Sequence, residues 1–297
     1  MFGNLDFLHQ ANATLAEGPL WDDRTGSIYW VDIRRCRVFR FEVQSMRQTG
    51  VWVTENRTGC VGLTDDPSIL IVAHGREIDL LDMRTGTMKS IATLPIESPR
   101  FRANDGRVDC NGSLWIGTMI DDILAPEQFS GGRLFRVDPD GAVQDAEVEF
   151  ELPNGMGWSP DQKAFYINDT TVGRTYRFDF DADSGLLSNQ VVLFDHSQLE
   201  GFPDGMSVDS DGNIWSAQWD GWNIRKISPS GELLQQFPMP VRRPSSAAFF
   251  GEAMNQIVIT SATVDFTSED FRKSPDAGSL FAMATDATGL PDHHFAI

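Results

Sequence analysis

The chain has 297 residues and a formal net charge of −19, from 43 Asp and Glu against 24 Lys and Arg. Nucleic-acid binding depends on clustered Lys and Arg side chains, so this charge balance argues against a nucleic-acid partner. Because the sequence shows neither a secretion signal nor 18 consecutive apolar residues, we expect a soluble, cytoplasmic protein with no membrane partner.

A turn rich in Asp, Gly, Asn or Pro runs into a short apolar strand six times along the chain. The strand centres are 41 to 51 residues apart, at Tyr29, Leu70, Trp115, Tyr166, Trp215 and Val258. Repeats of about 40 to 50 residues with several short strands each are typical of β-propeller blades. The sequence therefore predicts an all-β fold, a six-bladed β-propeller with a central channel, in which residues 1–297 form one domain.

A second series of segments alternates apolar and polar residues and ends in turns such as DPDG or SPSG. Alternation of this kind predicts antiparallel strands that enter hairpins. The segments span residues 37–43, 76–83, 132–141, 173–185, 222–231 and 278–289. Taken with the first series, which is assigned to the inner strands, they predict four-stranded blades in which helices are essentially absent.

The ends of the ring need partners, because an open propeller would leave two unpaired strand edges. We expect the stretch before Leu15 to form the outer strand of the sixth blade, whose inner strands come from the C-terminal part of the chain. Two insertions, 119–132 and 264–278, are too long for hairpin turns. The first is predicted to be a loop over one end of the channel, between the first and second strands of the third blade; the second takes the matching place in the sixth blade.

Polar or small residues stand 11 or 12 positions before each strand centre. They are Glu17, Thr58 or Gly59, Asn104, Asn154, Asp204 and Ser246. Equivalent positions of successive blades converge on the propeller axis, so Glu17, Asn154 and Asp204 are expected to point into one channel mouth. The competing interpretation is that they are turn residues, since Asn or Asp followed by Gly is ordinary turn chemistry.

The sequence resembles the gluconolactonase, senescence marker protein and luciferin-regenerating enzyme family from about residue 14 to the C-terminus. The resemblance is carried by LAEGPLWDDRTGSIYWVDI, RANDGRVDCNGSLWIGTM, LPNGMGWSPDQKAFYINDT and FPDGMSVDSDGNIWSAQWDGWNIRKISPSG. It implies a six-bladed propeller with one divalent metal ion, bound by the Glu of EGP, the Asn of PNG and the Asp of PDG. These are Glu17, Asn154 and Asp204.

Two carboxylates and one amide oxygen suit Ca²⁺, Mg²⁺ or Mn²⁺ and tolerate Zn²⁺. The three cysteines form no CxxC pair, so a thiolate zinc site is not indicated. The resemblance further implies that Arg102 and Asn104 of RANDG bind sugar hydroxyls. A family acidic residue shortly after GTM also contacts substrate, and here Asp121 and Asp122 compete for that place.

The leading functional hypothesis is metal-dependent hydrolysis of a sugar lactone to its aldonic acid, which would place the protein in carbohydrate metabolism. Asp204, or a metal-bound water under its influence, would act as the base. A second hypothesis is hydrolysis of an organophosphate or another ester at the same metal site. A third is a non-catalytic binding propeller with a structural ion. An arginine near the channel, Arg242 or Arg243, could favour an anionic lactone.

Overall fold

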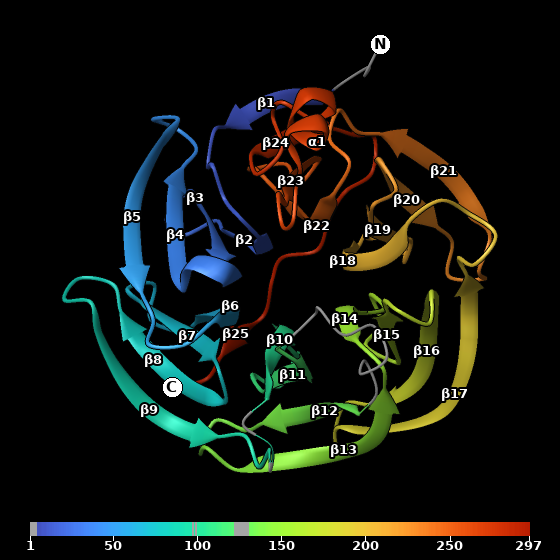
Figure 1. The fold of residues 1–297 in the computed structure, drawn as a ribbon. Coiled ribbons are helices and arrows are strands. Elements are labelled where there is room, and N and C mark those ends of the chain that lie inside the picture. The colour runs from blue at the N-terminus through green and yellow to red at the C-terminus, as the bar shows by residue number, and fades with distance from the viewer. Residues whose placement is uncertain (1–4, 97, 99, 122–130) are drawn as a thin grey trace.

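In the described residues, 5–96, 98, 100–121 and 131–297, the computed structural model forms six sheets around a central axis (Figure 1). Blade 1 contains β2 (Ala16–Asp22), β3 (Ser27–Asp32), β4 (Arg37–Glu42) and β5 (Arg47–Val53). Blade 2 contains β6 (Thr58–Thr64), β7 (Ile69–His74), β8 (Glu77–Asp82) and β9 (Thr87–Thr93). Blade 3 contains β10 (Phe101–Val108), β11 (Leu114–Ile120), β12 (Gly132–Val137) and β13 (Val143–Phe150).

The remaining blades repeat this order from the axis outward. Blade 4 contains β14 (Pro153–Trp158), β15 (Ala164–Asp169), β16 (Arg174–Asp181) and β17 (Leu186–Asp195). Blade 5 contains β18 (Phe202–Val208), β19 (Ile214–Trp219), β20 (Asn223–Ile227) and β21 (Leu233–Pro238). Blade 6 contains β22 (Pro244–Phe250), β23 (Gln256–Ser261), β24 (Leu280–Ala284) and β1 (Leu5–His9). The predicted six-bladed propeller is confirmed.

The N-terminal strand closes the ring as predicted, because β1 pairs antiparallel with β24 as the outer strand of blade 6. The C-terminal segment adds a connection that the sequence did not indicate. It crosses the middle of the ring (Figure 1) and ends in β25 (His294–Phe295), which pairs parallel with β6. On its way Asp292 forms an ion pair with Arg107 of β10 at 2.6 Å. Phe295 is buried against blades 2 and 3.

The predicted order of strands within a blade was wrong by one position. The apolar strand centres, such as Tyr29 and Trp215, lie on the second strands β3 and β19, and the polar residues upstream of them lie on the innermost strands. The innermost strands show no apolar alternation because they face the channel. The insertion at 119–132 consequently falls between the second and third strands, β11 and β12.

The recurring turn before the second strand has a physical explanation in blades 3 and 5. Asp109 accepts hydrogen bonds from backbone N–H groups of the turn and from Trp115 Nε1 at 2.8 Å. Asp209 does the same for its own turn and for Trp215 Nε1 at 3.0 Å. One carboxylate therefore closes the turn and fixes the indole that packs between blades.

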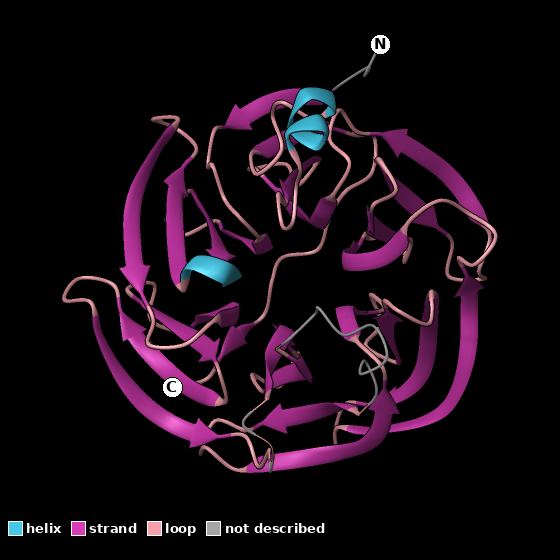
Figure 2. Cartoon of the chain, in the orientation of Figure 1, coloured by secondary structure: helices cyan, strands magenta, loops and turns pink. Residues whose placement is uncertain are grey.

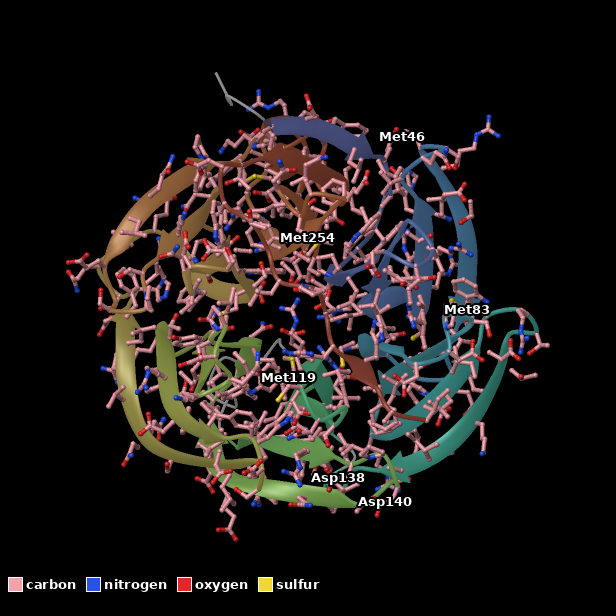
Figure 3. The ribbon with its side chains drawn as sticks, turned by 180° about the vertical axis from the view of Figure 1, so that it is seen from behind. Met46, Met83, Met119, Asp138, Asp140 and Met254 are labelled. Carbon is pink, nitrogen blue, oxygen red and sulfur yellow. The ribbon has the colours of Figure 1, made fainter. Side chains whose placement is uncertain are left out.

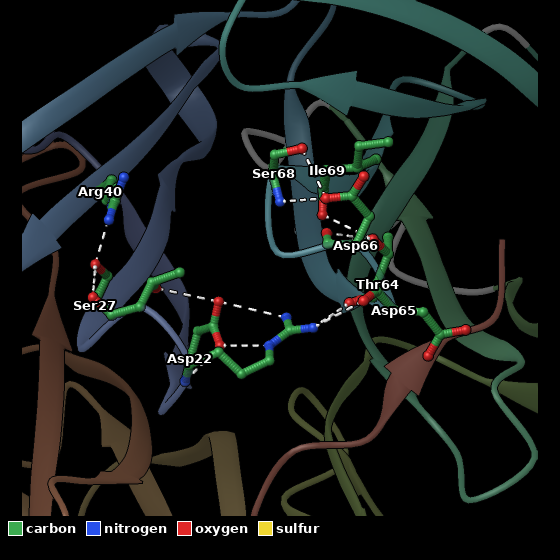
Figure 4. A network of polar contacts seen from close by, with 10 residues as sticks. Asp22, Ser27, Arg40, Thr64, Asp65, Asp66, Ser68 and Ile69 are labelled. Atoms are coloured by element: carbon green, nitrogen blue, oxygen red, sulfur yellow. Dashed lines mark hydrogen bonds and ion pairs between the residues drawn. The ribbon is translucent and has the colours of Figure 1, made fainter.

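The core lies between neighbouring blades. The second strands are buried except at some of their ends, and β3 with Tyr29 and Trp30 is buried throughout, because both faces of each blade are covered. The outer strands are more exposed, with Leu186 of β17 68% exposed. Polar contacts also join blades: Arg24 of blade 1 binds Asp22 and donates to the Thr64 carbonyl of blade 2 at 2.8 Å (Figure 4).

Among the described residues, helical structure is confined to short connections (Figure 2). The 3₁₀ turn η1 (Ile33–Arg35) follows β3, and α1 (Ser268–Lys273) lies in the 264–278 insertion. Thr267 and Asp270 cap α1 reciprocally, a capping box that the sequence interpretation missed. Within the described residues, none of the helices has the length and apolar character needed to span a bilayer.

Candidate metal and lactone site

A cavity of about 230 Å³ lies on the propeller axis, near the first residues of the innermost strands. Its polar lining is Glu17, Arg102, Asn104, Asn154, Asp204 and Asp220, together with Thr170 and Thr171. Its apolar lining is Leu15, Ile33, Met119, Leu152, Phe202 and Trp219. Figure 3 places Met119 close to the centre of the ring, whereas Met46 and Met83 lie at the rim. An apolar cavity with a few converging polar groups is the usual form of a small-molecule site.

Glu17, Asn154 and Asp204 reach this cavity from β2, β14 and β18 of blades 1, 4 and 5. All three are buried, at 7%, 6% and 3% exposure. The Asn154 amide donates a hydrogen bond to Asp204 Oδ1, and its own oxygen accepts from the Gly155 backbone N–H at 3.0 Å. The structure thus brings together the three side chains that the sequence placed at one channel mouth.

The glycine after Asn154 is required by crowding at the axis. Gly155 has a φ of +37°, a left-handed value, and a Cβ at this position would lie 2.3 Å from the Asp204 carbonyl oxygen. Only glycine combines this conformation with so close an approach of two strands. The PNG motif therefore sets the spacing between Asn154 and Asp204.

Three carboxyl groups, those of Glu17, Asp105 and Asp204, share the channel, and the nearby Arg102 and Arg107 offset their charge only in part. Burial, followed by the charges of Asp204 and Asp105, raises the pKa of Glu17 well above its usual value. Burial and then the charge of Asp105 likewise raise the pKa of Asp204. Buried like charges of this kind are costly unless a cation lies among them.

These residues fit a divalent cation. In the described part of the chain, His, Cys, Asp and Glu alone form no three-residue metal site, so an amide oxygen must complete the set. Asn154 can supply it, because a half-turn of the amide exchanges its oxygen for the N–H now directed at Asp204. Two carboxylates and one amide oxygen form the hard-oxygen site that Ca²⁺ and its analogues prefer.

Asp105 was missed by sequence reasoning. It follows Asn104 directly in RANDG, borders the channel below the cavity and accepts a hydrogen bond from the Gly106 N–H at 2.9 Å. Burial raises its pKa, while Arg107 lowers it. Its position in the RANDG motif was a usable signal. Successive side chains of a strand point to opposite faces, however, so Asp105 was expected to point away from the face that carries Asn104. A bulge between Ala103 and Gly106 brings it to the channel.

Arg102 is buried beside the cavity at 3% exposure. Its Nε donates to Asp121 Oδ1 at 2.9 Å, and its Nη1 donates to the Ala103 carbonyl and to Asn104 Oδ1 at 2.8 and 3.1 Å. The Asn104 amide in turn donates to the Pro153 carbonyl at 3.3 Å. Arg102 and Asn104 are therefore fixed in place beside Asn154.

Of the two aspartates after GTM, Asp121 contacts Arg102 and also accepts a hydrogen bond from Arg57. Asp121 does not line the cavity, and its carboxylate holds Arg102 in position by accepting a hydrogen bond from Nε. Asp122 lies outside the described residues.

A buried polar network supports Asp204 from the side away from the cavity. The Asn168 amide donates to the Asp204 carbonyl at 2.6 Å, and Thr175 donates to Asn168 Oδ1 at 2.6 Å. His196 contacts Thr175 through Nε2 at 3.0 Å and accepts from Arg225 at Nδ1 at 2.8 Å. The imidazole must be neutral to accept there.

Because of His196, we expect the free energy of unfolding to decrease in acid. Burial, then the Arg225 charge, lowers the pKa of His196 to about 3 from 6.5. As pH falls, His196 is protonated in the unfolded chain before it is protonated in the folded protein. The free energy of unfolding therefore decreases as pH drops from about 6.5 towards 3, by about 2 to 3 kcal/mol between pH 7 and 4.5. Urea unfolding at both pH values should show a smaller loss in His196→Gln than in the parent. An equal loss would contradict the assignment.

Comparison with known proteins shows how this fold and site are related to others. The model of the SMP-30/gluconolactonase/LRE-like region matches residues 15–263. Among curated relatives, the pentonolactonase XacC of Haloferax volcanii is 32% identical over 94% of this chain and 93% of its own length. The L-arabinolactonase of Azospirillum brasilense is 31% identical over 99% of this chain and 96% of its own length.

Among solved structures, a calcium-binding regucalcin from Agrobacterium tumefaciens superposes with a TM-score of 0.91. It is 26% identical and covers 98% of this chain and 97% of its own. Fold and site thus define a six-bladed propeller with an oxygen-rich site on its axis. The chain belongs to the SMP-30/gluconolactonase/LRE-like family.

Proposed function

We propose that this protein hydrolyses a sugar lactone to the corresponding sugar acid, with a divalent metal ion held by Glu17, Asn154 and Asp204. The observation that carries the proposal is the convergence of these three oxygen-bearing side chains in one apolar-walled cavity beside Arg102 and Asn104. Relatives named pentonolactonase and L-arabinolactonase, aligned over almost the whole chain, support the reaction class.

Each residue has a distinct role in this proposal. When bound, the metal supplies a Lewis acid that polarises the lactone carbonyl. Asp204 holds the proton removed from the attacking water. Arg102 and Asn104 donate hydrogen bonds that orient the ring hydroxyls, which places the carbonyl against Asp204. Trp219 and the other apolar lining residues offer an apolar surface to the sugar ring, which limits the water that competes for these contacts.

The proposal is tested by measuring proton release from a panel of sugar lactones. The protein is first stripped of metal, and Ca²⁺, Zn²⁺, Mn²⁺ and Mg²⁺ are then restored one at a time. Hydrolysis of at least one lactone above the spontaneous rate, with one of these metals, is the expected result. An inactive protein on all lactones and simple esters would favour a binding propeller instead.

Arg102→Lys should lower kcat/KM for the best lactone by about 10- to 100-fold while the protein remains folded. Lysine keeps the charge, but it cannot reproduce the fork that joins Asp121 to Asn104. Arg133→Lys is a matched control, since Arg133 lies on the same blade with its side chain 47% exposed and paired to Asp145. Unchanged kcat/KM in Arg102→Lys would remove Arg102 from the site.

A further inference from the structure

Two groups of arginines lie on the face of the propeller that carries the cavity. The first, called the blade 1–3 cluster, consists of Arg34, Arg57 and Arg102 with Asp121. The second, called the blade 5–6 cluster, consists of Arg242 and Arg243 with Asp220 and Asp270. Arg102 and Asp220 each line the cavity, so both groups border the space that a substrate would occupy.

The blade 5–6 cluster is neutral. Arg242 Nε and Arg243 Nε contact Asp220 Oδ1 at 2.8 and 2.6 Å, and Arg242 Nη1 contacts Asp270 at 2.9 Å. The Arg243 guanidinium also lies 4.7 Å from the Trp219 ring centre. Two positive and two negative charges leave no excess. These arginines are occupied in fixing Asp220 and Trp219, so the expectation that they attract an anionic substrate finds no support in their contacts.

The blade 1–3 cluster has an excess of positive charge. Arg57 and Arg102 pair with Asp121, and with Arg34 these four side chains carry a formal charge of +2, in a chain whose total charge is −19. The Glu17 carboxylate lies near enough to interact with Arg102 as well. Asp121 is shared, since it contacts both Arg57 and Arg102. The cluster therefore retains capacity to bind anions that the blade 5–6 cluster lacks.

Arg34 is the arginine of the blade 1–3 cluster that has a buried hydrogen-bond donor without an acceptor among the described residues. It is half-buried on η1, directly after Ile33, which lines the cavity. Within the described residues it forms no ion pair, and its Nε is buried without a hydrogen-bond partner. A buried donor of a charged group normally has an acceptor, so the Arg34 Nε is available to bind one supplied by a ligand. Burial lowers the pKa of Arg102 to about 10, Asp121 opposes this, and the charges of Arg57 and then Arg34 add to the lowering.

We propose that Arg34 and Arg57 form an anion subsite beside the cavity, and that the preferred substrate is a sugar lactone carrying a second acidic group away from the lactone ring. This inference rests on the proposed lactonase function. A carboxylate or phosphate would supply the acceptors that the Arg34 guanidinium lacks, in charge-assisted hydrogen bonds. Binding energy from this remote group would help hold the carbonyl at Asp204.

The test compares Arg34→Gln with Arg35→Gln. Both variants remove one positive charge from η1, but Arg35 is directed to Asp32 at 3.6 Å and its side chain is 44% exposed. Three lactones are used: neutral glucono-1,5-lactone, 6-phosphoglucono-1,5-lactone and glucaro-1,4-lactone. The last two distinguish a phosphate from a carboxylate as the recognised group. Rates are measured at about 0.15 M salt, where exposed charges are screened beyond about 8 Å.

The parent protein should show kcat/KM at least tenfold higher for one acidic lactone than for the neutral one. Arg34→Gln should reduce that ratio at least tenfold, while Arg35→Gln should leave it within twofold of the parent. No preference for either acidic lactone in the parent, or the same ratio in Arg34→Gln and the parent, would overturn the anion subsite.

Failure of the lactonase function is distinguished by a binding measurement. If no lactone is hydrolysed with any metal, the proposed function fails, and the subsite is decided by calorimetric titration of the glucarate dianion into the Ca²⁺-loaded protein. Binding at least tenfold weaker in Arg34→Gln than in Arg35→Gln supports the subsite. Equal binding in the two variants, or none in the parent, overturns it.

Discussion

Asp204→Asn should lower kcat for lactone hydrolysis by about 10² to 10⁴, the usual effect of losing a general base. Asparagine has the size of aspartate and keeps one oxygen that can face a metal, but it cannot hold the proton taken from water. Excess metal should therefore not restore the rate. The measurement is kcat with metal saturation shown separately by calorimetry.

The matched control is Asp209→Asn. Asp209 is also buried and lies just beyond the same strand, β18, but its carboxylate binds Asn213 and Trp215 rather than the cavity. Its replacement should lower the melting temperature and leave the kcat of the folded protein close to that of the parent. Parental kcat in metal-saturated Asp204→Asn would show that the base lies elsewhere.

Removal of divalent ions with a chelator should abolish lactone hydrolysis and lower the melting temperature by several degrees. In the proposed site, a cation bound by Glu17 and Asp204 would offset the repulsion of two buried carboxylates, and an ion present at 100 times its Kd stabilises a fold by about 2.7 kcal/mol. Restored Ca²⁺ or another divalent ion should recover both properties.

Asp204→Ala serves as the comparison for chelation. This variant loses one of two charged oxygen ligands, so added metal should raise its melting temperature much less than that of the parent protein. A parent protein whose melting temperature and activity are both indifferent to chelation would contradict the metal site.

The sequence predicted the ring well because blade packing leaves a strong periodic signal. Trp115 and Trp215 recur at the same place in their repeats since both faces of a second strand must be buried. The signal assigned these residues to the wrong strand, however, because the innermost strands face a narrow polar channel and carry no alternation. The pairing of Phe295 with β6 was not predictable from a two-residue strand.

The candidate site was predictable where a residue keeps the blade register. Glu17, Asn154 and Asp204 hold equivalent positions, so counting along the repeats selected them. Asp105 was missed because the counted position in its blade is the preceding residue, Asn104, and the register shift between Ala103 and Gly106 brings Asp105 to the channel as well. Arg34 was missed for a different reason. Its proposed role in anion binding depends on which carboxylates pair with the neighbouring arginines, and pairing between residues far apart in the chain leaves no pattern in the sequence.

The C-terminal crossing narrows the space at the end of the axis away from the cavity. Among the described residues, two small cavities of about 20 and 40 Å³ lie beyond Asp105, the second bordered by Asp292 and His293 of the crossing segment. On this measure a cavity needs about 10 to 15 Å³ to hold one water molecule, so these two have room for a few waters and are far smaller than the 230 Å³ cavity. The lactone and the sugar acid would then enter and leave through the same opening of the 230 Å³ cavity, so the bound acid would prevent a new lactone from binding. Inhibition by the product should accordingly be competitive with the lactone.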